Sequence, residues 1–156
     1  MNQLRRTFLK SAGSLGAVAV AVGAGLLRPG QVFAAAWNKV AFTATNVTEA
    51  MKEAGYGGAA DSKDILIKVP EIAENGALVP VEVTSKIAGT TNIAIFVDQN
   101  QNPMIADFEI GNGTEGFIVT RIKMNKTSLV RIGVKAGGKA YTASKEVKVT
   151  VGGCGG

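Results

Sequence analysis

The chain has 156 residues, 46% of them apolar, so it is long enough to bury one core and too short for two ordinary domains. It contains no histidine, which excludes a histidine general base, a histidine metal ligand and a Ser-His-Asp relay. The formal net charge of +5 would suit a nucleic-acid partner. However, residues 1–36 hold four basic residues and no acid, and without them the net charge is only +1. We therefore expect no nucleic-acid partner.

The charges of the remaining chain are unevenly spread along the sequence. Residues 37–115 hold five basic and eleven acidic residues, whereas residues 116–156 hold eight basic and one acidic residue. A positive final quarter would help to attract small anions. The interpretation we favour is that the two groups of charges mix in space when the chain folds.

Residues 1–36 have the character of a cleavable export signal. Residues 4–10 form a charged head that contains the pair Arg5 and Arg6, and a weakly hydrophobic run rich in Ala, Gly and Val follows over residues 12–27. Small residues close the segment, so we expect cleavage after Ala34 or Ala36. The pattern resembles the twin-arginine type, although Leu4 occupies the usual Ser/Thr position. A permanent membrane anchor is the disfavoured alternative, because a span needs ~20 strongly apolar residues. We expect a periplasmic protein.

One short helix is predicted near the start of the mature chain. Asn46 is suited to cap a helix, with Glu49 three residues later, and Gly55 is suited to end it. Between these positions four apolar residues recur at helical spacing: Val47, Ala50, Met51 and Ala54.

The rest of the chain is predicted to form β-strands. Alternation is clear in the valines at positions 79, 81 and 83, and turn residues at 99–103 and 136–139 favour hairpins. The predicted strands cover residues 64–69, 77–87, 92–98, 104–110, 116–124, 128–136 and 139–151. About seven such strands indicate an all-β domain over residues 37–151, a two-layer antiparallel β-sandwich of immunoglobulin-like type, with an open barrel as the alternative. An edge or face of this sandwich is expected to meet a second subunit.

Residues 152–156 carry the candidate chemistry. The single cysteine of the chain, Cys154, is flanked by Gly152, Gly153, Gly155 and Gly156. A segment with so few side chains is expected to be a flexible arm with an exposed thiol, reaching ~10 Å from the last strand. The sequence shows no activating group beside this thiol. We therefore expect a covalent attachment point on a carrier, not an enzyme, with catalytic groups, metal and cofactors absent from this chain.

Three alternatives remain for this cysteine. In the first, the cysteine is an incidental residue in a frayed tail. In the second, it forms a permanent intermolecular disulfide in an exported structural β-sandwich. The third is a diglycine sulfur carrier that uses a terminal thiocarboxylate, which the export signal and the strand count disfavour. An exposed thiol in an oxidising compartment is normally a liability, which favours a functional thiol over an incidental one.

The segment 143–156 is similar to the Y subunit of the sulfur-carrier complex in the Sox thiosulfate-oxidising system, the SoxY family. Residues 72–83 and 120–124 also resemble that family. The resemblance implies that Cys154 is the carrier cysteine and that the four glycines around it form a swinging arm. It also implies an immunoglobulin-like sandwich and a heterodimer with a SoxZ-type subunit. To Asn75, Gly76 and Pro80 we assign only turn geometry and partner contact.

The same resemblance implies the chemistry of the partners. In such systems a haem-containing c-type cytochrome joins thiosulfate to the cysteine as an S-thiosulfonate. A hydrolase then releases sulfate and leaves a persulfide. The cofactors belong to those partners, and export of the carrier and its SoxZ-type subunit would use the signal of this chain.

Overall fold

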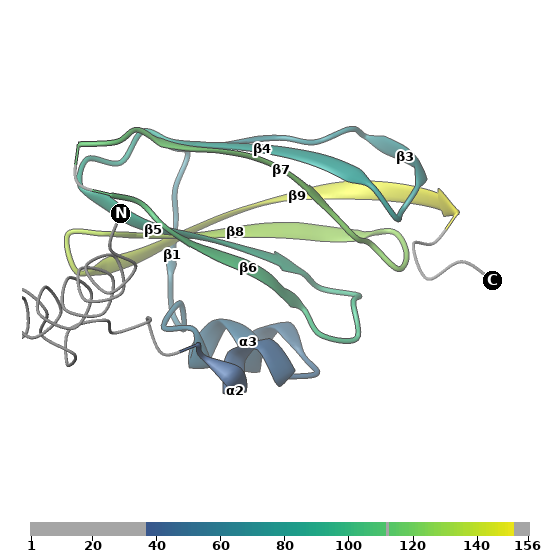
Figure 1. Cartoon of the computed structure of the whole chain (residues 1–156), viewed down its shortest axis with the longest axis horizontal. Coiled ribbons are helices and arrows are strands. Elements are labelled where there is room, and N and C mark those ends of the chain that lie inside the picture. Colours follow the sequence, from purple (N-terminus) through teal and green to yellow (C-terminus); the bar gives the residue numbers. More distant parts are fainter. Residues whose placement is uncertain (1–36, 112, 152–156) are drawn as a thin grey trace, which may run out of the picture. The chain divides into compact units, whose positions relative to one another are not determined.

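The computed structural model describes residues 37–111 and 113–151, and the helices and strands belong to one compact unit that begins at Asn38 (Figure 1). The predicted export signal and the predicted arm lie outside the described residues. Within these described ranges, two short helices precede nine strands. The elements are α2 (Lys39–Thr43), α3 (Val47–Glu53), β1 (Ala60–Asp61), β2 (Ile65–Lys68), β3 (Ile72–Asn75), β4 (Val79–Ser85), β5 (Thr90–Val97), β6 (Met104–Glu109), β7 (Gly116–Ile122), β8 (Ser128–Ala136) and β9 (Lys139–Val151).

The predicted helix corresponds to α3, and its capping residues behave as expected. The Asn46 side chain accepts a hydrogen bond from the Glu49 backbone N–H at 2.8 Å and donates one to the Glu49 carboxylate at 3.0 Å. Gly55 follows the helix with φ +78°, a conformation that glycine adopts without steric cost. A second helix, α2, was not predicted; the Asn38 side chain caps it by accepting from the Ala41 N–H.

The strands form two sheets that face each other across a hydrophobic core. The larger sheet has the order β1-β9-β8-β5-β6, with β3 also paired to β9, and the smaller sheet has the order β2-β4-β7. Most neighbouring strands are antiparallel, but β1 and β3 both run parallel to β9. In Figure 1 the small sheet, with β4 and β7, lies on one side of the large sheet, and α2 and α3 lie on the other.

Alternation of side chains divides the interior into two clusters. Alternate residues of β5 and β8, such as Ile93, Ile95 and Ile132, face the core between the sheets and are fully buried. The intervening residues of β5, Ala94 and Phe96, face the helices instead and are also fully buried. Strand β5 is therefore covered on both faces, which explains its nearly continuous apolar sequence.

The structure confirms the predicted all-β class, the sandwich and the predicted strands. It adds β1 and β3, which the sequence pattern did not indicate. The hairpin between β8 and β9 turns at Gly137 and Gly138, with φ of +56° and +73°, as predicted for that segment. Within the described residues, no helix is long and apolar enough to cross a bilayer.

Candidate functional site

The residues predicted to carry the chemistry follow directly after the last described strand. Cys154 and the glycines at 152, 153, 155 and 156 lie outside the described residues, so the structure shows the support from which this segment extends. That support is the final part of β9. Strand β9 has thirteen residues, but its pairing with β8 stops at Val147, opposite Ser128. We call the four residues beyond this point, Lys148–Val151, the end segment of β9.

The end segment is held on both of its edges. Strand β3 runs parallel to it, with Ile72 opposite Lys148 and Asn75 opposite Val151 (Figure 1). The Thr150 hydroxyl donates to the Glu74 carbonyl at 3.0 Å. From the β7–β8 connection, the Thr127 hydroxyl accepts a hydrogen bond from the Val149 N–H at 3.0 Å. The Thr127 hydroxyl thus supplies a partner on the edge where β8 has ended, and the Thr150 hydroxyl supplements the pairing with β3 on the other edge.

Gly76 joins the end segment to the core. Its N–H donates to the Val151 carbonyl at 2.8 Å, and its own carbonyl accepts from the Met124 N–H at 2.7 Å. Met124 is fully buried between the sheets. The Asn75 side chain fixes the turn by accepting from the Ala77 N–H at 2.8 Å. The turn geometry assigned to Asn75 from the sequence is therefore observed, whereas partner contact at Asn75, Gly76 and Pro80 stays a prediction.

The interior of the described part holds one tyrosine with a shifted pKa. Tyr56 is fully buried, and its hydroxyl donates to the Asp107 carboxylate at 3.4 Å. Burial raises the pKa of Tyr56 well above its ordinary value, and the charge of Asp107 raises it further. The phenol therefore stays protonated at neutral pH and cannot serve as a base. Lys135 lies 4.6 Å from the ring centroid and donates to the Ala54 carbonyl, so its ammonium group is also engaged in the fold.

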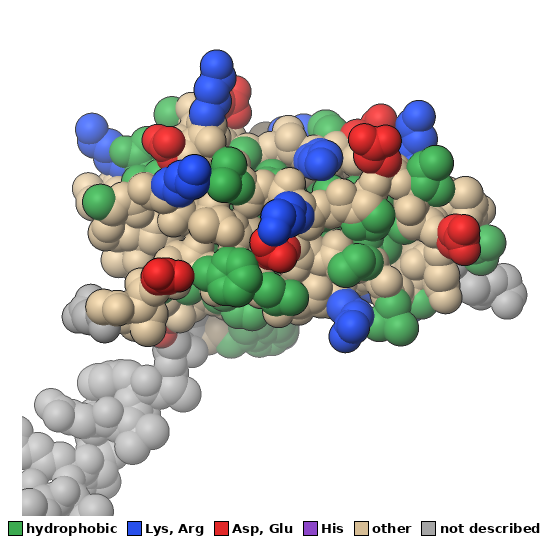
Figure 2. Space-filling model, turned by 90° about the horizontal axis from the view of Figure 1, so that it is seen from above, with side chains coloured by type: hydrophobic (Ala, Val, Ile, Leu, Met, Phe, Trp, Pro, Cys, Tyr) green, Lys and Arg blue, Asp and Glu red, His purple; other side chains and the backbone are tan. Residues whose placement is uncertain are grey.

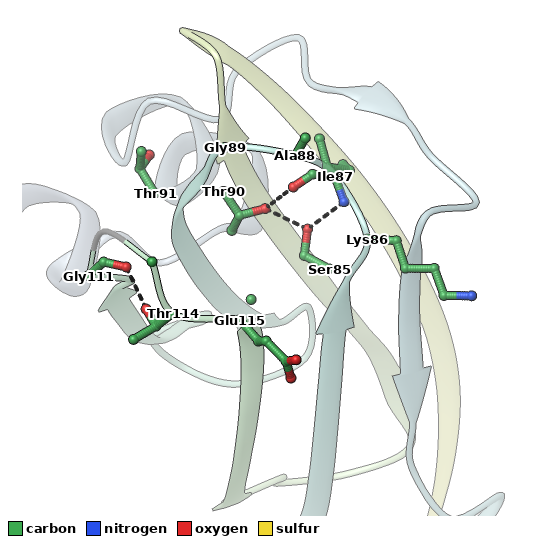
Figure 3. A pocket seen from close by; sticks show the side chains of 12 residues that line it. Ser85, Lys86, Ile87, Ala88, Gly89, Thr90, Thr91, Gly111, Thr114 and Glu115 are labelled. Carbon is green, nitrogen blue, oxygen red and sulfur yellow. Dashed lines mark hydrogen bonds between the residues drawn. The ribbon is translucent and has the colours of Figure 1, made fainter.

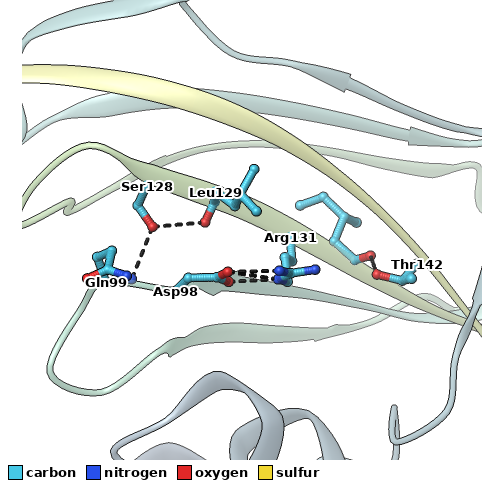
Figure 4. Close-up of polar contacts among 7 residues, drawn as sticks. Asp98, Gln99, Ser128, Leu129, Arg131 and Thr142 are labelled. Atoms are coloured by element: carbon cyan, nitrogen blue, oxygen red, sulfur yellow. Dashed lines mark hydrogen bonds and ion pairs between the residues drawn. The ribbon is translucent and has the colours of Figure 1, made fainter.

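The Asp98–Arg131 ion pair also stabilises the fold (Figure 4). The Arg131 Nε lies 2.8 and 3.0 Å from the two Asp98 carboxylate oxygens, and one terminal nitrogen lies 2.9 Å from the second oxygen. The hydrogen bond to Asp98 raises the pKa of Arg131 above its ordinary value, which is already high. This guanidinium is therefore occupied by an internal carboxylate that fixes the end of β5 against β8.

A polar hollow of about 490 Å³ lies between the β4–β5 and β6–β7 connections (Figure 3). Its hydroxyls are engaged with one another and with the backbone. The Ser85 and Thr90 hydroxyls lie 2.7 Å apart, and the Thr90 hydroxyl also donates to the Ile87 carbonyl. Across the described residues no buried side-chain nitrogen or oxygen lacks a partner, and no group of three carboxylate, thiol or imidazole side chains is placed to hold a metal ion.

Charges of both signs share the surface over the small sheet. Figure 2, seen from the side of β4 and β7, shows Lys and Arg side chains interspersed with Asp and Glu side chains and with hydrophobic ones. Lys68 and Glu82 on neighbouring strands form an exposed ion pair at 2.6 Å. The Asp98–Arg131 pair joins one residue from each group of charges, which agrees with the favoured interpretation that the two groups mix on folding.

Comparison with protein families identifies the chain. The model of the family described as sulfur oxidation protein SoxY matches residues 52–154, more than half of the chain. The chain belongs to the SoxY family. The family match includes position 154 and the whole of β9. The resemblance noted in the sequence is thereby confirmed.

A solved structure of a family member supports the same conclusion. The sulfur carrier protein SoxY from Chlorobium limicola f thiosulfatophilum is 46% identical to this chain, with a TM-score of 0.56. The match covers 63% of this chain and 91% of that one. Superoxide reductase (neelaredoxin) from Ignicoccus hospitalis is 18% identical, and the match covers 65% of this chain and 87% of that one with a TM-score of 0.49. No curated protein sequence matches the chain.

Membership of this family gives the chain a carrier role in sulfur oxidation. The sequence did not indicate the supporting residues Thr127 and Thr150. The Thr127 hydroxyl has a role because β9 extends past β8, and the Thr150 hydroxyl has one because β3 lies beside β9; both arrangements join segments that are distant in the sequence.

Proposed function

We propose that this chain holds sulfur intermediates covalently on the Cys154 thiol, and that it is a carrier without catalytic activity of its own. The observation that carries the proposal is the family match, which extends to position 154, where the sequence has its single cysteine. A thiol holds sulfane sulfur through an S–S bond that other thiolates and enzymes exchange reversibly.

The loading step is an oxidation that needs an external electron acceptor. The Cys154 thiolate and the outer sulfur of thiosulfate form an S–S bond, which gives a cysteine S-thiosulfonate and releases two electrons. A partner c-type cytochrome would supply the acceptor for these two electrons. Hydrolysis of the adduct by a second partner then adds water across the terminal S–S bond, so that sulfate leaves, a persulfide remains on Cys154 and two protons are released.

Haem and hydrolytic metal chemistry belong to those partners in this proposal, so the chain binds no cofactor. We assign to it a heterodimer with a SoxZ-type subunit, weak and reversible contact with each enzyme, and no stable insertion in a membrane. Residues 1–36 would direct export of the folded pair to the periplasm by a twin-arginine-type signal. Support for this location comes from the paired arginines, the weakly hydrophobic run and the small residues at positions 34–36.

Reconstitution of loading tests the proposal. The heterodimer is incubated with thiosulfate and the oxidised c-type cytochrome, and the intact mass and peptide map are recorded before and after addition of a reductant. We expect a single thiosulfate-derived adduct, which maps to Cys154 and which the reductant removes. A protein that stays unmodified while the cytochrome is competent toward another carrier would refute the proposal.

The absence of side chains at the four glycines around Cys154 gives a further prediction. Gly153→Val introduces a branched side chain beside the thiol, so passage through a confined channel should be hindered and the rate of loading by the cytochrome should fall by about tenfold, or roughly 1.4 kcal/mol in the barrier. The melting temperature is expected to stay unchanged. Alkylation of Cys154 by iodoacetamide serves as the control, because this small reagent needs no channel. Equal loading rates for the variant and the parent would show that no narrow channel is involved.

A further inference from the structure

The end segment of β9 makes hydrogen bonds beyond those of its pairing with β3. Its backbone pairs with β3, the Thr127 and Thr150 hydroxyls link it to neighbouring segments, and the carbonyl of its last residue is bound by the Gly76 N–H. Gly76 in turn connects it to buried Met124. These contacts lie at the last described residues, directly before the segment that carries Cys154 in the sequence. Their position suggests a role in how the cysteine is presented.

We propose that β3, Thr127 and Thr150 are positioning elements that fix the starting point of the arm at Val151. The inference rests on the proposed function, because it concerns how partner enzymes reach Cys154. With Val151 held, Cys154 is the third residue beyond the fixed strand, and the thiol is confined to within ~10 Å of that point. If the end segment separated from β3, Cys154 would be the seventh residue beyond Val147, the last residue paired with β8.

The length of a tether decides how efficiently it delivers its cargo. The effective concentration of a tethered group falls roughly as the −3/2 power of tether length once the tether exceeds the span it must cover. An increase from three to seven residues therefore lowers the effective concentration at the mouth of a partner channel about fourfold. A held end segment keeps this concentration high, while residues 152–156 remain available to enter the partner.

Two features indicate that these contacts fix the position of the end segment and contribute little to the free energy of unfolding of the whole domain. Thr127, Thr150 and Glu74 are exposed, and exposed hydrogen bonds of this kind contribute little to the free energy of unfolding. The two buried clusters include no residue of the end segment as a fully buried member; Val149 is only partly buried. Loss of these bonds should therefore release the end segment while the two clusters stay intact.

The double variant Thr127→Val, Thr150→Val tests the proposal, because valine keeps the branched shape and strand preference of threonine and removes only the hydroxyl. Thr142→Val is the matched control. Its hydroxyl donates to the Ile132 carbonyl at 3.1 Å, a bond of the same type on the same strand but eight residues before Thr150. Amide hydrogen exchange is measured first on the heterodimer. We expect the Val149 and Gly76 amides to exchange about fivefold faster in the double variant and at the parent rate in the control.

Loading kinetics then connect the change to function. With thiosulfate and the oxidised cytochrome, we expect the KM for the carrier to rise twofold to about fourfold in the double variant with kcat unchanged, and the control to match the parent. Iodoacetamide should alkylate Cys154 equally fast in all three proteins. Unchanged amide exchange, or faster exchange with an unchanged KM, would overturn the positioning role. Failure of the parent itself to load would instead refute the proposed function, and hydrogen exchange would still report whether the hydroxyls hold the end segment.

Discussion

Replacement of Cys154 by serine is expected to abolish both the loading of thiosulfate-derived groups and thiosulfate oxidation in cells that depend on this carrier. A serine hydroxyl cannot form an exchangeable bond to sulfane sulfur, and the chain has no second cysteine that could substitute. The loss should therefore be complete within detection and not merely a lowered rate. Growth on thiosulfate and the intact mass of the isolated protein are the two measurements.

The serine variant should keep its fold and its partner. The two hydrophobic clusters are formed by residues between Ala41 and Val149, so we expect an unchanged melting temperature and normal assembly with the SoxZ-type subunit. These properties provide the control that distinguishes lost chemistry from lost folding. Growth on thiosulfate at the parent rate with Cys154→Ser as the only copy would contradict covalent carriage on this residue.

Gly133→Ala is expected to destabilise the fold by about 2 to 3 kcal/mol, the largest effect on stability that we predict for a single methyl group. Gly133 lies on β8 directly beneath the Tyr56 ring. A β-carbon at this position would lie 2.6 Å from Tyr56 Cδ1 and 2.9 Å from Cε1, inside van der Waals contact. The ring cannot easily move away, because it is fully buried, packs edge-on against Phe96 at 5.8 Å and lies beneath Lys135. Alanine also lowers the entropy of the unfolded chain, which favours folding by only about 0.4 to 1 kcal/mol.

Urea denaturation of Gly133→Ala measures this effect. Gly111→Ala is the control, because a β-carbon there meets only the Thr114 hydroxyl at 3.8 Å. In a Tyr56→Leu background the same Gly133→Ala change should cost at least about 1 kcal/mol less, since the smaller side chain removes the close contact. An equal cost in both backgrounds would show that the Tyr56 ring is not the cause.

The parts of the fold that could be predicted are those in which the local sequence shows the alternation of buried and exposed residues in a strand, or the capping residues of a helix. Strand β4 alternates buried valines with exposed or partly buried residues, and Asn46 with Glu49 marks the start of α3. Strand β3 lacks such a pattern: only Ala73 of its four residues is buried, and the apolar Ile72 is exposed. It exists as a strand because β9 offers the edge opposite to the one that pairs with β8, which is a property of the assembled sheet.

The candidate site also has one part that the sequence indicates and one part that it does not. Cys154 could be singled out from the sequence because one thiol among four glycines is chemically distinct. The support around Val151 could not, because Gly76, Met124 and Thr127 meet β9 only after the two sheets have packed. Gly133 likewise appears ordinary in the sequence, since its need for glycine comes from Tyr56, which precedes it by 77 residues.

The most direct test of covalent carriage is peptide mass spectrometry of the protein isolated from thiosulfate-grown cells, with non-reducing gels run in parallel. We expect sulfur adducts confined to Cys154 on a fraction of the molecules, removable by reductant, with at most partial covalent dimer. An unmodified thiol in every preparation, or quantitative disulfide-linked dimer, would contradict the carrier account.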